Sequence, residues 1–323
     1  MNVTEAQTTT INQVGILSPW DANGEKDVWD AFKDGLTELG YPEGKGVTFV
    51  SRFADGNFDR LTAFAAELVQ LGVDVIVPAT PPPIKAAKSA TSTIPIVFPV
   101  GSDPVELGLV LSYERPGGNV TGVATMSWKL SRPRLALLNE LMPSARKVAL
   151  IRHSANVALD LQVGETRAAS SQLGIDLVVF ELGGAQELEG AFCAAKQQGA
   201  SAMMALSDPM AANNSARIVS LSFKYRIPVV SPYMHMAKAG AVLAYGPNRA
   251  LLYRRAASLV ARVLKGAKPG DLPIEQPNQF DLVINIKSGK ALVCQFPKPC
   301  SRVQRASFAR SSRSRGSTSA CGR

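Results

Sequence analysis

The sequence predicts an α/β protein of two Rossmann-like lobes, each built around a parallel sheet. Three observations carry this prediction. Short apolar, often β-branched runs alternate with longer helical patterns, this rhythm occurs twice, and it pauses near residue 120 between the two halves. The length of 323 residues, with 46% apolar and 19% charged, suits two globular domains rather than one.

The first half of the chain predicts four strands separated by three helices. One helix shows the pattern clearly, because Leu61, Phe64, Leu68 and Leu71 recur every three or four residues and share one face. The strands are almost continuously apolar, which is typical of parallel sheets covered on both faces. We expect strands at residues 14–17, 47–53, 74–79 and 94–100, and helices at 28–39, at 57–71 and after the prolines at 81–83.

After the pause at residues 115–123 the same alternation returns without obvious sequence repetition. A second lobe with similar architecture is the simplest interpretation. Its predicted strands lie at residues 147–152, 176–181, 201–206, 228–230 and 240–245, and its helices at 157–173, 186–198, 212–225 and 250–264.

The two ends of the chain differ from the body. Residues 291–323 contain seven Lys or Arg and no acid, so they account for seven of the net charge of +9 and leave +2 for the rest. A near-neutral body with a basic tail is not the basic face of a nucleic-acid-binding protein, and we predict no nucleic-acid partner. Residues 293–323 are rich in Ser and Arg without any period, so we predict a disordered basic tail, and residues 1–12 predict a disordered start.

The sequence lacks most signatures of enzyme chemistry. No G-x-G-x-x-G follows the first strand and no G-x-S-x-G occurs. The two histidines, His153 and His235, have no neighbouring cluster of Cys, His or Asp, so we predict no metal site. The residue types of a Ser-His-Asp triad are present, as in any chain of this length, and carry little weight. We therefore predict a protein that is not an enzyme and needs no cofactor.

Polar and aromatic residues follow the predicted strands, where open parallel sheets bind their ligands. Each Asp-Pro or Ser-Pro pair among them also fits a helix N-cap, and the two aromatic residues also fit core positions, so both alternatives stay open. The candidate ligand-binding residues at these strand ends are Trp20, Thr80, Asp103, Ser154, Asp208 and Tyr233.

Several blocks of residues 13–292 resemble one known family. The blocks are GLTELGYPEGKGVTF, FDRLTAFAAELVQLGVDVIV, ATSTIPIVFPVGSDPVELGLV, RPGGNVTGV and KGAKPGDLPIEQPNQFDLVINIK, in order and at sensible spacing. They resemble ABC transporter substrate-binding proteins of the tryptophan/tyrosine-binding type.

The resemblance implies a type I periplasmic-binding architecture. Lobe 1 would comprise residues 13–122 plus 248–275, and lobe 2 residues 123–247 plus 276–292. Three hinge crossovers would lie near 120–127, 245–248 and 273–280, and Gly117, Gly118 and Gly122 would serve the first, since Gly absorbs backbone rotation cheaply.

The resemblance also implies a function. The chain would capture a small molecule, such as an amino acid or related carboxylate, by closing its lobes, and would act as a monomer with ABC permease and ATPase subunits. The helix start after Thr80 would bind a carboxylate through backbone N–H groups. Asp103 and Asp208 would face an amine, and Trp20, Tyr233 and Tyr245 would flank a ring.

Both ends depart from the family pattern. The resemblance implies a periplasmic location, but the N-terminus carries no complete signal peptide, although Thr4, Glu5 and Ala6 resemble the end of a cleavage site. For the tail we hypothesise a one-nucleotide deletion near the codon of Val293, with a natural basic extension as the alternative. A cytosolic ligand sensor, a regulator-type domain of the same fold and a non-exported degenerate paralogue are alternative functions. A regulator would need a helix-turn-helix, and only about a dozen residues precede the first strand.

Overall fold

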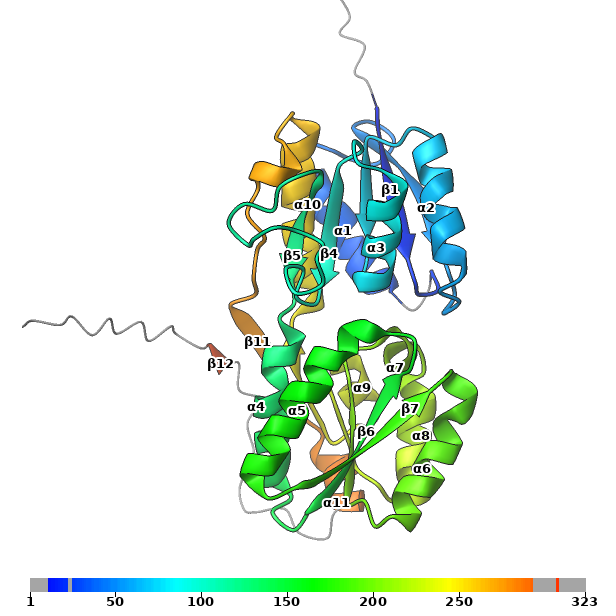
Figure 1. Ribbon diagram of the computed structural model, residues 1–323, viewed down its shortest axis with the longest axis vertical. Coiled ribbons are helices and arrows are strands. Elements are labelled where there is room, and N and C mark those ends of the chain that lie inside the picture. The colour runs from blue at the N-terminus through cyan, green and yellow to red at the C-terminus, as the bar shows by residue number, and fades with distance from the viewer. Residues whose placement is uncertain (1–10, 23–24, 293–305, 308–323) are drawn as a thin grey trace, which may run out of the picture.

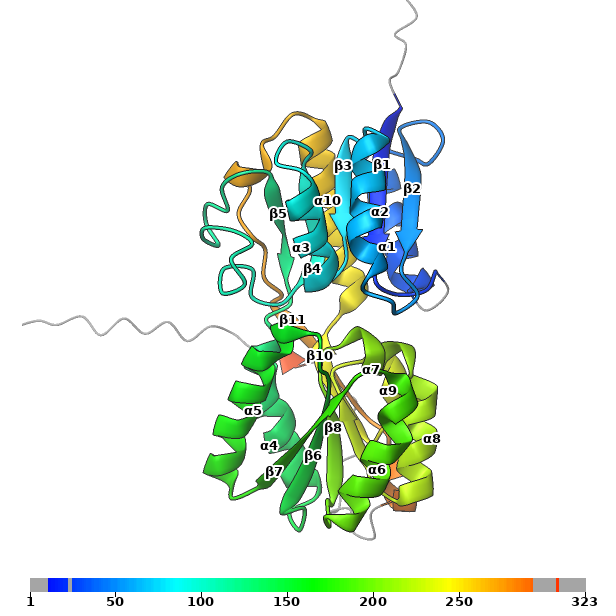
Figure 2. The same cartoon turned by 45° about the vertical axis from the view of Figure 1, so that its right-hand side comes forward.

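Two separate sheets organise the computed structural model, which describes residues 11–22, 25–292 and 306–307. One sheet has five strands in the order β2-β1-β3-β4-β5, and the other has seven in the order β12-β11-β10-β9-β8-β6-β7. Each sheet forms its own lobe with helices on its faces, and the lobes stand one above the other (Figures 1 and 2). Most of the predicted start and tail, including the hypothesised frame change, lies outside the described residues.

The first lobe has an entirely parallel sheet. Its helices α1 (Lys26–Glu38), α2 (Arg60–Gln70) and α3 (Pro81–Ala90) are joined by α10 (Arg249–Leu264), which returns from the second half of the chain and packs against α1. Four of its five strands form from the predicted apolar runs and are mostly buried, except the edge strand at residues 47–53, which is largely half-buried. The five strands are β1 (Asn12–Ser18), β2 (Val47–Phe53), β3 (Val75–Pro78), β4 (Ile96–Gly101) and β5 (Val120–Ala124).

The second lobe carries the remaining elements. Its strands are β6 (Lys147–His153), β7 (Asp176–Leu182), β8 (Ala202–Ala205), β9 (Val229–Ser231), β10 (Leu243–Pro247), β11 (Gln279–Ile284) and β12 (Ala306–Ser307). Its α-helices are α4 (Ser131–Leu141), α5 (Asp160–Leu173), α6 (Leu188–Gln197), α7 (Pro209–Asn213), α8 (Ser215–Tyr225), α9 (Met234–Ala239) and α11 (Ile286–Leu292). Three short 3-10 helices, η1 (Ser127–Leu130), η2 (Val157–Leu159) and η3 (Ala185–Glu187), also belong here, and η4 (Pro269–Asp271) lies in the first lobe.

The sequence led us to expect a wholly parallel second sheet, but two of its strand pairs are antiparallel. Strand β11 runs antiparallel to β10, and β12 runs antiparallel to β11. The connectivity explains the direction of β11. The chain leaves this lobe at the carboxyl end of β10, passes through α10 in the first lobe and re-enters at the same end. It must therefore run back along β10.

A strand forms where the sequence rhythm pauses. All five residues of β5 are buried, and β5 pairs with β4 across a register shift between Phe98 and Gly101. Pro99 lies within that shift, where its missing N–H cannot join the ladder. Gly122 has φ +155°, and a Cβ there would lie 2.3 Å from the Phe98 carbonyl oxygen. Close packing against Phe98 thus requires a glycine at residue 122.

Three connections link the lobes, at the ends of β5 and β10 and before β11 (Figure 1). The first and third run together, because the Ala124 N–H donates to the Glu275 carbonyl at 2.8 Å. Gly117 and Gly118 do not lie at a connection, which corrects their expected hinge role. They form the turn before β5, at the strand's opposite end, with φ +71° and +60°, and the Gly117 N–H donates to Gly270.

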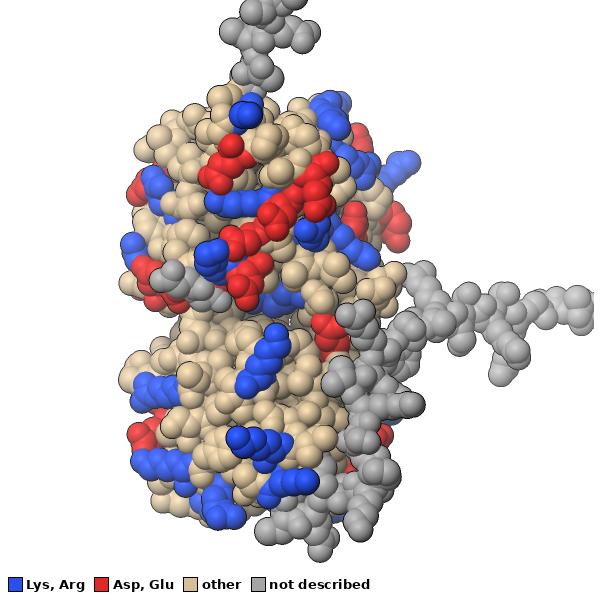
Figure 3. All heavy atoms as spheres, turned by 180° about the vertical axis from the view of Figure 1, so that it is seen from behind, with Lys and Arg blue, Asp and Glu red and all other residues tan. Residues whose placement is uncertain are grey.

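The surface carries charges of both signs. Figure 3 shows acidic and basic residues side by side on the first lobe, whereas Lys and Arg are more frequent on the visible face of the second. None of the helices in the described part of the chain is both long and apolar enough to cross a bilayer.

Candidate functional site

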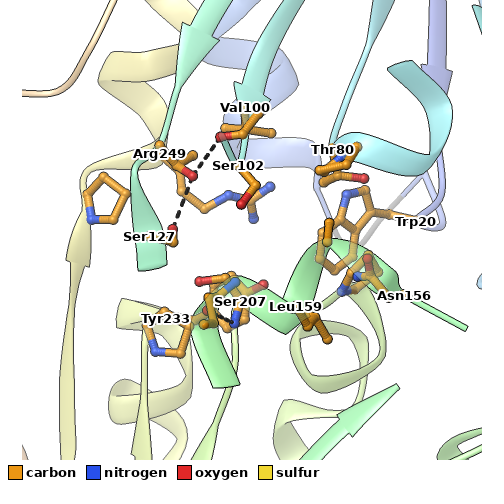
Figure 4. A pocket seen from close by; sticks show the side chains of 18 residues that line it. Trp20, Thr80, Val100, Ser102, Ser127, Asn156, Leu159, Ser207, Tyr233 and Arg249 are labelled. Carbon is orange, nitrogen blue, oxygen red and sulfur yellow. Dashed lines mark hydrogen bonds between the residues drawn. The ribbon is translucent and has the colours of Figure 1, made fainter. Parts of the chain in front are cut away.

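A cleft lies between the two lobes, where the carboxyl ends of both parallel sheets face each other (Figure 4). It contains about 630 Å³ of empty space, counting the solvent at its mouth. Loops that follow strands line it from both sides, as expected for open α/β sheets. The first lobe supplies Trp20, Thr80 and Ser102 after β1, β3 and β4, and the second supplies Asn156, Ser207 and Tyr233 after β6, β8 and β9.

Four polar atoms of this lining are buried without a hydrogen-bond partner in the described part of the chain. They are the Trp20 indole nitrogen and the hydroxyl oxygens of Thr80, Ser102 and Ser207. A buried polar group without a partner destabilises a fold by about 1–3 kcal/mol, and native proteins contain few of them. Four of the ten such atoms in the described chain therefore gather around this one cleft, which makes it the candidate binding site.

Thr80 lies in a strained backbone conformation. Its φ of +74° and ψ of 161° fall in a region that is almost restricted to glycine. Two hydrogen bonds hold it there: the Thr80 N–H donates to the Val100 carbonyl at 3.0 Å, and the Ile84 N–H donates to the Thr80 carbonyl at 3.2 Å. Strain of this kind is typical of functional sites.

The start of α3 cannot bind a carboxylate through backbone N–H groups, contrary to our expectation. Its first three residues are Pro81, Pro82 and Pro83, which have no N–H. The next N–H, of Ile84, already donates to Thr80. Only the Thr80 hydroxyl remains as a hydrogen-bonding group of this helix start toward the cleft.

Arg249 is the one charged side chain among the described residues that line the cleft. It pairs with Glu25, whose carboxylate is buried and also accepts hydrogen bonds from the Ser18 hydroxyl at 3.1 Å and from the Tyr253 hydroxyl at 3.5 Å. Burial raises the pKa of Glu25, and Arg249 opposes that shift. The guanidinium also lies over the rings of Trp20, Tyr233 and Tyr253, at 5.3, 5.9 and 5.8 Å.

The sequence analysis missed Arg249, although one signal was available. It is the first residue of α10, where the positive end of the helix dipole disfavours a cation. A basic residue at that position needs an acid from elsewhere, and Glu25 supplies it.

Asp208 does not line the cleft. Its carboxylate is fully buried and accepts from the Met210 N–H at 2.7 Å, which caps α7, and from the Asn156 side-chain amide at 2.9 Å. Burial raises the pKa of Asp208, and the hydrogen bond from Asn156 opposes that shift. The helix-cap alternative therefore describes Asp208 in this structure, and Asn156, which the sequence analysis missed, lines the cleft in its place.

Three other predicted residues lie outside the lining. Asp103 accepts from the N–H groups of Val105 and Glu106, both at 3.1 Å, so it caps a turn rather than facing an amine. Ser154 is exposed. Tyr245 is buried in the core of the second lobe, with its ring 6.0 Å from that of Phe280. The structure thus gathers Trp20, Thr80 and Tyr233 around one cleft and leaves the other predicted residues out.

The two lobes contact each other beside the cleft. Trp20 belongs to the first lobe but packs into a core cluster of the second, where it is only 2% exposed. The ring of Phe58, also in the first lobe, lies 5.3 Å from that of His153. Trp20 therefore bridges the two lobes. Among the described residues, no group of three His, Cys, Asp or Glu side chains is placed to hold a metal ion.

Comparisons with known proteins agree with this architecture. Residues 13–303 match the family described as ABC transporter substrate binding protein. A tyrosine-binding protein of Clostridioides difficile strain R20291 is 26% identical over 264 residues, which cover 82% of this chain and 76% of the relative.

Two solved structures have the same two-lobed fold. A conserved domain protein from Vibrio cholerae is 27% identical, with a TM-score of 0.83 over 89% of this chain and 96% of that one. An ABC domain from Streptococcus pneumoniae in complex with L-Trp is 23% identical, with a TM-score of 0.82 over 88% and 95% of the two chains. The family match extends over most of the sequence, and the fold is that of type I periplasmic-binding proteins, so this chain belongs to the ABC transporter substrate-binding proteins.

Proposed function

We propose that this substrate-binding protein captures a small molecule with an aromatic ring, an amino acid or related carboxylate, in the cleft between its lobes. The ligand holds the lobes closed, and the closed form delivers it to an ABC permease and its ATPase in the periplasm. The protein itself performs no reaction. Family membership supports the coarse role, and the relatives that bind tyrosine and L-Trp suggest the class of ligand.

The observation that carries this proposal is the set of unpartnered polar atoms, because they come from both lobes. Trp20, Thr80 and Ser102 belong to the first lobe, and Ser207 belongs to the second. A ligand that bonds to both sides interacts more strongly with the closed form than with an open one, and so shifts the equilibrium toward closure.

The walls of the cleft favour a flat apolar group. Trp20 and Tyr233 lie in the lining together with four prolines, and flat rings pack well against such surfaces. The lining prolines are Pro81, Pro209, Pro232 and Pro247.

Isothermal titration calorimetry with tyrosine, tryptophan, phenylalanine and the corresponding deaminated carboxylates tests the proposal. We expect one-to-one binding of at least one aromatic member, with unchanged ligand mass after incubation. Trp20→Leu should weaken that binding at least tenfold, whereas Trp128→Leu, outside the lining, should leave it within twofold. Binding of aliphatic compounds alone would contradict the proposal, and conversion of a ligand to product would contradict the purely binding role.

A further inference from the structure

We infer that the cleft selects a ligand that carries a carboxylate but no ammonium group, with Arg249 as the residue that recognises the carboxylate. This inference rests on the proposed function and narrows its ligand class to aromatic carboxylic acids rather than amino acids. It starts from the charges of the described residues around the cleft.

No acidic side chain is among the described residues that line the cleft. The acids nearest in sequence to lining residues are each engaged. Asp208 caps α7 and accepts from Asn156, Asp103 caps a turn, and Asp160 pairs with Arg152. Asp21 follows Trp20 but is outside the lining and has an interaction of its own. An ammonium group taken into this cleft would lose its water without gaining an anion, which is strongly unfavourable.

Arg249 is suited to an anion because its position is fixed and most of its donors are unused. Within the described chain its hydrogen bonds go to Glu25, through one terminal nitrogen, and to the Tyr253 hydroxyl. A guanidinium has five N–H donors in a planar fork, so several remain for a second acceptor. The buried Glu25 and three aromatic rings hold the guanidinium in place, and a fixed donor loses little entropy on binding.

The alternative anion site at the start of α3 is closed by its three prolines. The hydroxyl groups of Thr80, Ser102 and Ser207 and the Trp20 indole N–H add neutral hydrogen-bonding groups around the same space (Figure 4). The cleft thus offers one guanidinium, paired on one side with Glu25, together with neutral donors and acceptors and apolar walls. This set complements an aromatic ring with a carboxylate and other uncharged polar groups.

Matched ligand pairs test the inference by calorimetry on the full chain. Tyrosine and 3-(4-hydroxyphenyl)propanoate differ only in the ammonium group, as do tryptophan and indole-3-propanoate. We expect each deaminated acid to bind at least tenfold more tightly than its amino acid. The methyl ester of 3-(4-hydroxyphenyl)propanoate, which lacks the carboxylate charge, should bind at least tenfold more weakly than the acid.

Two sets of variants assign these preferences to residues. The double variant Glu25→Gln with Arg249→Gln removes both charges together, so that no buried ion is left without a partner. It should reduce the preference for the acid over the ester to about twofold. Arg254→Gln on the same helix, whose partner is the exposed Glu38, should keep the full preference. Exchanging the cleft-lining amide and its buried partner, by Asn156→Asp with Asp208→Asn, puts a carboxylate in the lining and should move the preference at least tenfold toward the amino acids.

The outcomes separate the two proposals. Tyrosine or tryptophan binding as tightly as its deaminated partner would overturn this inference and leave the proposed function standing. An unchanged preference for acid over ester in the charge-free pair would also overturn it, because another group would then recognise the carboxylate. If no aromatic compound of either kind binds, the proposed ligand class fails, and this inference fails with it.

Discussion

Arg134 and Tyr245 join two of the connections between the lobes. The Arg134 Nε donates to the Tyr245 carbonyl oxygen at 2.7 Å, on the strand that leads into the second connection, and its Nη1 donates to the Ser127 carbonyl at 3.5 Å, on the first. The side chain is fully buried, and one terminal nitrogen has no partner in the described chain. Arg134 therefore carries an uncompensated charge at the point where the lobes are linked.

The first prediction compares Arg134→Lys with Arg134→Met. Burial lowers the pKa of Arg134 to about 10, so the charged form is costly in the fold. Lys keeps a buried charge but cannot donate to both carbonyls, and we expect it to lower the free energy of unfolding by about 2 kcal/mol. Met removes the charge as well as the hydrogen bonds and should destabilise less. Urea unfolding measures both, with changes at the exposed Arg132 of the same helix as controls.

The pH dependence linked to Arg134 has a definite sign. The folded-state pKa lies below the unfolded value, so the unfolded chain binds more protons as the pH rises above about 10. The contribution of this group to the free energy of unfolding therefore rises with pH in that range. The difference between wild type and Arg134→Met should show this slope, and a flat difference would contradict the buried charge.

The second prediction concerns the ion pair of Glu25 and Arg249. Arg249→Met leaves the buried Glu25 without its cation and should lower the free energy of unfolding by about 3–5 kcal/mol at pH 8. Burial raises the pKa of Glu25, and without Arg249 nothing as strong opposes it. A raised carboxyl pKa stabilises the fold at low pH and loses that effect as pH rises through the folded value. The loss should therefore be smaller at pH 5 than at pH 8, and equal losses would contradict the pairing.

Thr80 gives a third prediction, in which stability and binding change in opposite directions. Thr80→Gly relieves the strained backbone and should raise the free energy of unfolding by about 1 kcal/mol. It also removes a cleft hydroxyl, so ligand binding should weaken. Thr80→Ala loses the same hydroxyl but keeps the strain, so it should weaken binding and remain about 1 kcal/mol less stable than Thr80→Gly. Thermal unfolding and calorimetry on both variants separate the two effects, and equal stability of the two variants would contradict the strain.

The fourth prediction concerns the buried hydrogen bond between Asn156 and Asp208. Asp208→Asn places an amide donor against the Asn156 amide donor and should lower the free energy of unfolding by about 2 kcal/mol. Adding Asn156→Asp restores one donor and one acceptor and should recover more than half of the loss. Urea unfolding of the two single variants and the pair completes a double-mutant cycle. A pair that shows the sum of the single losses would contradict the contact.

The elements of the fold could be predicted from the sequence wherever local pattern decides them. The strand predicted at residues 47–53 is β2 itself, and most other strands and helices lie within a few residues of their expected positions. The failures lie where long-range pairing decides. Strand β5 has no strong local pattern and forms because β4 offers a partner, and β11 reverses direction because the chain re-enters its lobe from the same end.

The sequence by itself determined the two-lobed α/β class and placed Trp20, Thr80 and Tyr233 at strand ends, because apolar periodicity and strand-end loops are local properties. The lack of free backbone N–H groups at the start of α3 also follows from its three consecutive prolines. Only the tertiary structure decided which polar groups line the cleft. The Asp208 carboxylate caps α7 instead of lining the cleft. Glu25 and Arg249, 224 residues apart in the chain, form an ion pair that fixes the guanidinium in the cleft. The pairing of Glu25 with Arg249 depends on the return of α10 to the first lobe, which no local pattern encodes.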